Sequence, residues 1–280
     1  MKILDTKATG TENRRESSQE IRRAQRKNSL SNSWTNTWPA LLFLLILLFA
    51  WEYGVRLFEV DPLFLPSISS IVHSTIKNFS GTKIWYHWWT TIRTFGVGYL
   101  LGVPTGIVIA SMLSQSKLAA KAFTPLVVML VTLPTMVVIP TYMVWVGYNV
   151  GYRSIIVFIQ VTSILTLNTL TGFENIDANK LALAKTYGAN RAQTFFKVIF
   201  PNALPEVIQG MRLGVTFSIT TTIGIELVAG TPGLGYVVSF QSGMLETSLA
   251  WGCILLIGLT GRVLFMFVQV LERHLLTWKR

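Results

Sequence analysis

The chain has 280 residues, of which 51% are hydrophobic and only 13% charged, and its mean hydropathy is +0.48. Soluble domains carry about 25% charged residues, so this composition excludes an ordinary soluble protein and indicates a membrane protein. The net charge of +11 does not indicate nucleic-acid binding, because the basic residues lie between long apolar runs. The single cysteine, Cys253, excludes a disulfide framework and a cysteine-rich metal site.

The N-terminal segment, residues 1–37, is polar and carries eight Lys or Arg residues. It lacks the short apolar core and small-residue cleavage site of a secretory signal, so we expect an uncleaved cytoplasmic tail. Two interpretations of the tail stay open: a solvated disordered segment, or a segment that binds anionic lipid through residues 22–27. Residues 38–280 are then the membrane domain.

Six segments are long and apolar enough to span a membrane, since a spanning helix needs about 20 mostly apolar residues. The sequence therefore predicts an all-α polytopic fold with six membrane helices. They are Trp38 to Leu57, Thr91 to Leu113, Phe123 to Val146, Ser154 to Phe173, Val207 to Ala229 and Ser248 to Leu271. A short turn at residues 147–151 ends the third.

The distribution of Lys and Arg predicts the orientation of these helices, because positive residues concentrate in cytoplasmic loops. With both termini in the cytoplasm, seventeen Lys and Arg residues lie on the cytoplasmic side and five on the other. The loop over residues 230–247 has none. We therefore expect both termini to lie inside.

Three predicted spans carry distinctive residues. The second contains Gly98, Gly102 and Gly106, a small-xxx-small repeat that indicates close helix packing. The third contains Pro134 and Pro140, which are expected to kink it; each kink is either part of a gate or an ordinary bend. The fifth is rich in Thr and Ser, including Thr220, and is expected to face the bundle interior.

Ionisable residues inside spans suggest function because a charge in the bilayer is costly. Glu52 and Arg56 have the spacing of an i, i+4 ion pair, while Arg212 and Arg262 lie near the cytoplasmic ends of their helices. Glu226 lies near the outer end of the fifth span. It either lines an external gate or accepts backbone hydrogen bonds from the loop that follows.

The connection between the fourth and fifth spans, about residues 174–206, is long and basic. Residues 181–185 favour a helix, Gly188 can supply a C-cap turn, and residues 191–198 form a second helix that Pro201 is expected to stop. Phe195 and Phe196 are expected to be exposed. Such a helix pair either docks into a partner's groove or lies on the membrane surface as an amphipathic helix.

This connection resembles the cytoplasmic loop of ABC-importer permeases, which has an E-A-A-x-x-x-G motif followed by a Pro-x-x-x-Pro element. Here the motif is Ala182 to Gly188 and the proline element is Pro201 to Pro205. Ala182 replaces the family's Glu, which removes a specific ion pair from the expected contacts. Further similarity to the nitrate, sulfonate and taurine branch covers about residue 65 to the C-terminus, at Pro125, Pro134, Pro140, Trp145, Asn168, Gly172, Asp177, Glu226 and Gly233 to Tyr236.

The resemblance implies a type I importer permease in the bacterial inner membrane, with a separate cytoplasmic ABC ATPase dimer and a periplasmic or lipid-anchored binding protein. It also implies a homodimer of this chain and a small anionic substrate such as nitrate, a sulfonate or taurine. No cofactor is expected on this chain, since the partner ATPase uses ATP and Mg. The implied coupling residues are Ala182, Ala184, Lys185, Thr186, Gly188, Ala189, Pro201 and Pro205, and the candidate gate or path residues are Pro134, Pro140, Thr220 and Glu226.

Enzymatic motifs are absent from the sequence: it has no phosphate-binding GxxxxGK[ST], no HExxH and no GxSxG. His73, His87 and His274 are scattered, so no metal site is predicted. The chain is therefore not expected to hydrolyse ATP. The main alternative is a stand-alone secondary transporter or channel, and a second alternative is a membrane scaffold. The first would need coupling-ion or filter residues and often shows internal repeats, and neither is found.

Overall fold

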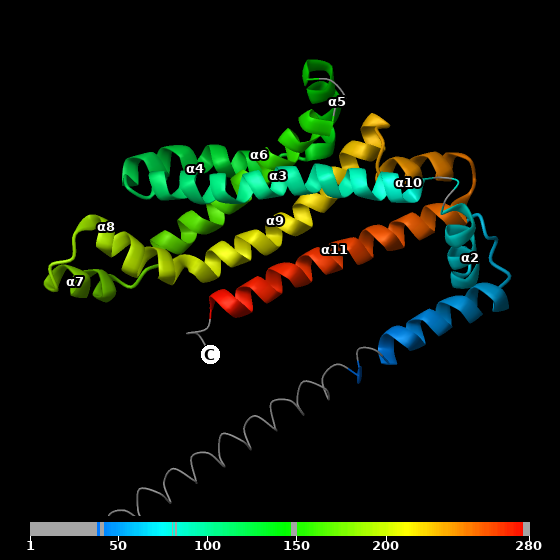
Figure 1. Ribbon diagram of the computed structural model, residues 1–280, viewed down its shortest axis with the longest axis horizontal. Helices are drawn as coiled ribbons and strands as arrows, with labels where there is room; N and C mark the ends of the chain where they lie inside the picture. Colours follow the sequence, from blue (N-terminus) through cyan, green and yellow to red (C-terminus); the bar gives the residue numbers. More distant parts are fainter. Residues whose placement is uncertain (1–37, 40–41, 80, 82, 147–149, 277–280) are drawn as a thin grey trace, which may run out of the picture. The chain divides into compact units, whose positions relative to one another are not determined.

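The computed structural model describes residues 38–39, 42–79, 81, 83–146 and 150–276 (Figure 1). The chain divides into two compact units, residues 1–61 with 67–69, and residues 62–66 with 70–280. Every regular element in the described part of the chain is helical, as predicted. The predicted tail, residues 1–37, and most of the predicted turn at 147–151 lie outside the described residues.

The smaller unit contains a helix over residues 42–57. Its apolar side chains are largely exposed, as in a helix that contacts lipid. Near its end, Arg56 and Glu52 form the predicted ion pair. Glu52 also accepts hydrogen bonds from the backbone amide of Ser69, at 3.1 Å, and from its hydroxyl, at 2.8 Å, so the pair ties this helix to residues 67–69.

The larger unit is a bundle in which α3, α6 and α9 lie side by side, with α11 and α10 against α9 (Figure 1). The helices are α2 (Ile68–Asn78), of which residues 70–78 belong to this unit, α3 (Ile84–Leu113), α4 (Lys117–Thr132), α5 (Thr135–Val146), α6 (Val150–Glu174), α7 (Ala178–Thr186), α8 (Arg191–Thr194), the π-helix η1 (Phe195–Ile199), α9 (Phe200–Ala229), α10 (Leu234–Gly243) and α11 (Thr247–Leu275).

Four helices in the described residues are long and apolar enough to cross a membrane: Ile84–Leu113, Gly151–Glu174, Arg191–Ala229 and Thr247–Leu275. The pair α4 and α5 forms a fifth candidate span if the two helices are counted together. The first predicted span includes residues 40–41, which lie outside the described part. The count of six and the orientation of the termini therefore stay predictions.

The third predicted span is broken between α4 and α5, which are bent by 94°. Leu133, the last residue before Pro134, has an extended backbone with ψ of 124°, because the proline ring excludes the α conformation from the residue before it. Pro140, by contrast, lies inside α5 without a second break. The predicted kink is thus confirmed at Pro134, whereas Pro140 is accommodated within a continuous helix.

The glycine repeat of α3 packs directly on α6. A Cβ atom on Gly98, Gly102 or Gly106 would lie 2.6 to 2.8 Å from the Cβ of Val157, Val161 or Leu165, respectively. No real Cβ reaches such distances without a shift of the backbone, so the three glycines allow the two helices to approach closely. Lipid is as apolar as the side chains, and van der Waals packing of this kind therefore stabilises helix pairs in membranes. The prediction of close packing is confirmed.

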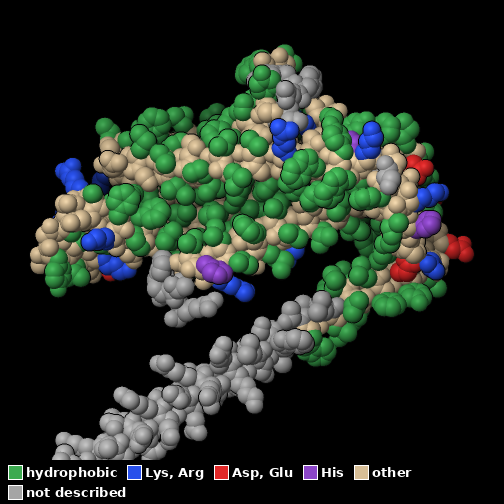
Figure 2. Space-filling model, viewed as in Figure 1, with side chains coloured by type: hydrophobic (Ala, Val, Ile, Leu, Met, Phe, Trp, Pro, Cys, Tyr) green, Lys and Arg blue, Asp and Glu red, His purple; other side chains and the backbone are tan. Residues whose placement is uncertain are grey.

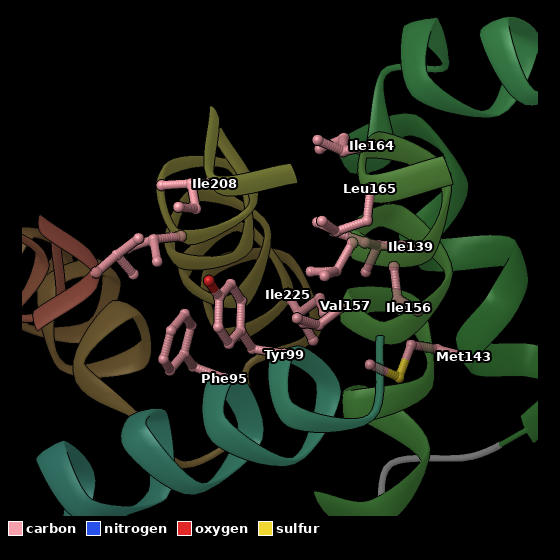
Figure 3. Packing of buried hydrophobic residues seen from close by; sticks show 13 residues of the cluster. Phe95, Tyr99, Ile139, Met143, Ile156, Val157, Ile164, Leu165, Ile208 and Ile225 are labelled. Carbon is pink, nitrogen blue, oxygen red and sulfur yellow. The ribbon is translucent and has the colours of Figure 1, made fainter. Parts of the chain in front are cut away.

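The main core joins α3, α5, α6, α9 and α11 (Figure 3). Phe95 and Tyr99 of α3 stack at 5.3 Å, and the Tyr99 hydroxyl donates to the carbonyl of Met211 at 2.9 Å. Outside this core, hydrophobic side chains cover most of the visible bundle face (Figure 2). An exposed apolar surface of this extent is a liability in water, but lipid covers it in a membrane protein.

Candidate coupling segment, path and loop clamp

The connection between α6 and α9 begins with a capped helix. The Asp177 carboxylate accepts a hydrogen bond from the amide of Asn179 at 2.8 Å and so caps the start of α7. In the first turn of α7, Lys180 donates a hydrogen bond to the side-chain oxygen of Asn202 on α9. The start of the connection is therefore held in place by side chains rather than by backbone alone.

A glycine elbow follows α7. Gly188 has φ of +71° and donates its amide to the carbonyl of Lys185 at 2.9 Å, while Ala189 donates to Ala184 at 3.0 Å. These two bonds are the Schellman pattern that ends a helix in the left-handed conformation. Asn190 then caps α8 through a reciprocal pair of bonds with Gln193. The predicted helix, glycine turn and second helix are confirmed.

The second helix does not stop at Pro201, and that part of the prediction was wrong. The segments α8, η1 and α9 together form a continuous helix over Arg191–Ala229. In the π turn, the amide of Phe200 bonds the carbonyl of Phe195, and the Asn202 side chain donates to the Val198 carbonyl at 2.7 Å. Pro201 directly follows the π turn, where the hydrogen-bond register of the continuous helix changes, so its missing donor is accommodated there.

One face of the connection is anchored by aromatic rings. Phe195 packs between Phe173 of α6 and Phe200 of α9, with ring centroids 5.6 and 6.3 Å apart. Phe195 is therefore half-buried, which corrects the expectation that it is exposed. The adjacent Phe196 is 69% exposed, as expected. These aromatic contacts hold the start of the helix Arg191–Ala229 against α6.

The helix α7 and the turn after it have no buried residues. Leu183 is 58% exposed and Tyr187 is 83% exposed, and neither was singled out from the sequence. The predicted coupling residues lie along this region: Ala182, Lys185, Thr186 and Gly188 are exposed, Ala184, Ala189 and Pro201 are half-buried, and Pro205 is half-buried within α9. The structure thus brings them onto one segment but does not test their role.

An open groove of about 680 Å³ lies beside this segment. Its walls come from the end of α3 and the turn after it, including Ser111 and Gln115, and from the connection, including Lys185, Arg191 and Phe196. The lining of the groove includes two basic side chains, Lys185 and Arg191, and two aromatic ones, Phe195 and Phe196. A partner with acidic and apolar side chains would match this surface.

The break between α4 and α5 lies beside the polar stretch of α9. Thr135, next to Pro134, has its hydroxyl 3.5 Å from that of Thr221 and accepts from the Gln160 amide at 3.3 Å. Thr221 also donates to Gln160. Thr220 is exposed and satisfies its hydroxyl within its own helix. Two predicted path candidates, Pro134 and Thr220, are therefore neighbours of one buried polar cluster.

Glu226 belongs to a different group of side chains at the C-terminal end of α9. Its carboxylate is fully buried and accepts hydrogen bonds from the Gly235 amide at 2.9 Å and from the Thr91 hydroxyl at 2.8 and 3.0 Å. Of the two predicted roles, the backbone acceptor is observed. A gating role for Glu226 stays a prediction, and Pro140, inside α5, is not part of this group.

Three further side chains hold the loop between α9 and α10. His87 Nδ1 accepts from the Gly233 amide at 3.0 Å, and Thr91 Oγ1 accepts from the Leu234 amide at 2.9 Å. The buried Arg153 donates to the Thr231 hydroxyl at 3.1 Å and to the Pro232 carbonyl at 2.9 Å. We call His87, Thr91, Arg153 and Glu226 the loop clamp.

Sequence patterns did not predict the loop clamp. Arg153 is one of the five Lys and Arg residues predicted on the outer side, yet it is 1% exposed within α6. The available signal was a pair of opposite charges, Arg153 and Glu226, near the same ends of two predicted spans. His87 and Thr91 lie more than a hundred residues from the loop they bind, and no local pattern marks such contacts.

The bundle of long apolar helices, with its exposed apolar surface, is that of a polytopic membrane protein. The chain belongs to the family described as the binding-protein-dependent transport system inner membrane component, whose model matches residues 102–277. It is therefore a multi-pass protein of the bacterial inner membrane and the permease subunit of an ABC importer, as the sequence predicted.

Among the relatives, the taurine transport system permease protein of Escherichia coli is 24% identical over 240 residues, which cover 84% of this chain and 87% of that protein. The formylaminopyrimidine transport permease protein of Halalkalibacterium halodurans is 26% identical over 239 residues, covering 85% and 95%. The structure of a bacterial alginate ABC transporter, in complex with a periplasmic protein bound to an alginate pentasaccharide, contains a chain that matches with a TM-score of 0.54 and 14% identity. It covers 84% of this chain and 94% of that one, so the fold is shared.

Proposed function

We propose that two copies of this chain form the translocation path of an importer and that the segment over residues 178–205 docks on a separate cytoplasmic ATPase. The observation that carries this proposal is the glycine elbow: Leu183 and Tyr187 before it are exposed, and the helix after it is anchored to the bundle through Phe195. A helix that begins directly after the elbow runs into the membrane bundle. A partner bound at the elbow can therefore move the bundle.

The basic groove beside the elbow supports a protein partner over a lipid surface. An amphipathic helix that lies on a membrane buries one apolar face, but here the apolar side chains point to two places: Phe195 into the bundle and Tyr187 away from it. The coupling residues we assign are Ala182, Ala184, Lys185, Thr186, Gly188, Ala189, Pro201 and Pro205. ATP and Mg would be used on the partner.

A small anion is the substrate class we propose, with taurine or another sulfonate as the first candidates. The taurine permease of Escherichia coli supports it, whereas the formylaminopyrimidine permease shows that similar chains serve other compounds. Thr135, Gln160 and Thr221 provide hydroxyl and amide groups beside the α4–α5 break, without a fixed charge. A path of this kind passes the ligand that a periplasmic or lipid-anchored binding protein delivers.

Reconstitution tests the proposed function. The chain is co-purified with its ATPase and its binding protein and placed in liposomes that contain ATP. We expect uptake of the binding protein's ligand only when all three components and ATP are present. Uptake of an anion by the chain alone, driven by an ion gradient, would support a secondary transporter or channel instead. Uptake that requires the ATPase but not the elbow would refute the docking assignment.

A further inference from the structure

The helix α10 begins with a residue that cannot cap it. Gly233 occupies the N-cap position and has no side chain to bind the first amides of the helix. Those amides are instead bound from elsewhere: Gly233 by His87, Leu234 by Thr91 and Gly235 by Glu226, at 2.9 to 3.0 Å. The N-terminus of α10 is thus capped by side chains of α3 and α9, and the position of α10 depends on them.

The loop and the clamp lie so close together that no side chain fits at position 233 or 235. A Cβ atom on Gly233 would overlap the Glu226 carboxyl group, and one on Gly235 would lie 2.7 Å from the carbonyl of Ile223. Gly233 has an extended φ of 164°, so the close approach, rather than its backbone conformation, is what requires glycine. The glycines around Pro232 would suggest a flexible hinge, but here they allow a carboxylate to reach the backbone.

Burial makes the clamp a stiff connection. Glu226 is fully buried and Arg153 is 1% exposed, and each charge removed from water must be compensated by hydrogen bonds and by the opposite charge nearby. Within the clamp, Nε of Arg153 has no hydrogen-bond partner in the described residues, but the Glu226 carboxylate accepts bonds from both Thr91 and Gly235. Breaking one of these bonds would leave a buried polar group without a partner, so they favour a single geometry. A loop held at Thr231, Pro232 and three successive amides has little freedom to swing.

The clamp also lies at the far end of the helix that leaves the elbow. Arg191–Ala229 is a 39-residue helix, about 58 Å long at 1.5 Å per residue. The helix begins within the docking segment, and Glu226 lies in its last turn. A displacement of the elbow can therefore move this helix and, with it, Glu226 of the loop clamp.

We propose that α10 is not a hinged flap but stays locked to α3 and α9 through the transport cycle, with Thr91 and Glu226 as the positioning residues. This proposal rests on the proposed function, since the cycle it describes is that of an ATP-driven importer. Opening at this end of the bundle then requires movement of the whole bundle. Energy from the docking segment reaches α10 only while the clamp is intact.

Thr91→Val provides the test, because valine keeps the shape of threonine and removes the hydroxyl that joins Glu226 to Leu234. Thr222→Val on α9 is the matched control: Thr222 is also fully buried, and its hydroxyl has no hydrogen-bond partner in the described residues. Thr91→Ser restores the hydroxyl. All variants are studied in the full complex in nanodiscs and in liposomes.

Hydrogen exchange at the amides of residues 233–235 is the first measurement. We expect slow exchange with and without ATP in the wild-type complex, at least tenfold faster exchange in Thr91→Val, and wild-type rates in Thr222→Val and Thr91→Ser. Fast exchange of these amides in any nucleotide state of the wild-type complex would show a flap and overturn the proposal. This measurement decides the point even if the complex fails to transport.

Uptake per ATP hydrolysed is the second measurement. We expect Thr91→Val to lower this ratio at least threefold, because ATP hydrolysis continues while α10 no longer follows, and Thr91→Ser to recover it. Equal losses of uptake and ATP hydrolysis would indicate a folding defect only and would overturn the positioning role. A wild-type complex without any ATP-dependent uptake would instead refute the proposed function and leave the exchange result standing.

Discussion

The elbow at Gly188 offers a substitution whose effect can be worked out from the backbone alone. Its φ of +71° is left-handed, and a Cβ atom there would meet nothing within 4 Å. A side chain at this position therefore causes conformational strain without a steric clash. That strain is roughly 1–2 kcal/mol for an ordinary residue, it is largest for β-branched residues, and it is smaller for asparagine, which visits this region readily.

This conformational strain is expected to lower the affinity of the chain for the ATPase. If the ATPase recognises the elbow, about 1–2 kcal/mol lowers its apparent affinity by a factor of about 5–30. We therefore expect Gly188→Val to weaken binding of the purified ATPase to the chain in nanodiscs by up to that factor. Gly188→Asn, as the matched control, should stay within about threefold of wild type. Microscale binding titrations at fixed nucleotide concentration measure both.

Two results would refute this reasoning. Unchanged affinity in Gly188→Val would mean that the left-handed turn is not part of the docking surface. An equal loss in Gly188→Val and Gly188→Asn would mean that the side chain itself collides with the partner, so that backbone geometry is not the cause.

The remaining predictions concern the bundle and are read by thermal unfolding of the detergent-solubilised chain. Gly102→Ala places a Cβ 2.8 Å from that of Val161 and is expected to destabilise the α3–α6 contact by about 1–3 kcal/mol. Gly96→Ala is the control in the same helix: its Cβ would meet nothing within 4 Å, so it is expected to be neutral or stabilising. Equal effects of the two substitutions would contradict the role of close packing. Glu272 and Arg212 form an ion pair in which the side chains are 29% and 25% exposed, respectively. Glu272→Gln breaks this pair and is expected to lower the free energy of unfolding by about 1.5–3 kcal/mol. The double variant Arg212→Met with Glu272→Met is expected to recover most of the loss, and no recovery would show that the pair is not the source of the effect.

Much of the fold could be predicted because its signals are local. Apolar runs of about 20 residues predicted the helices, and the spacing of Gly98, Gly102 and Gly106 predicted the close contact of α3 with α6. Pro134 predicted the break between α4 and α5. The π turn before Pro201 could not be predicted in this way. Whether a proline ends a helix depends on how the preceding turn disposes of the missing amide, and here Asn202 and Phe200 supply the compensating bonds.

The site was predictable in position but not in detail. The glycine and the two prolines located the connection, yet which aromatic is exposed depended on a tertiary contact, since Phe195 turns toward Phe173 while Phe196 does not. The loop clamp was the largest omission. Its residues come from three helices distant in sequence, and only the buried opposite charges of Arg153 and Glu226 hinted at it.

Accessibility at Tyr187 tests the central claim most directly. Cys253, 1% exposed, is the only cysteine in the sequence, so Cys253→Ala with Tyr187→Cys leaves one thiol on the elbow, where the native side chain is 83% exposed. A membrane-impermeant maleimide is expected to label inside-out vesicles but not intact spheroplasts, and saturating ATPase is expected to block the labelling. Labelling from the outer side, or labelling that the ATPase leaves unchanged, would contradict the docking of an ATPase at this segment.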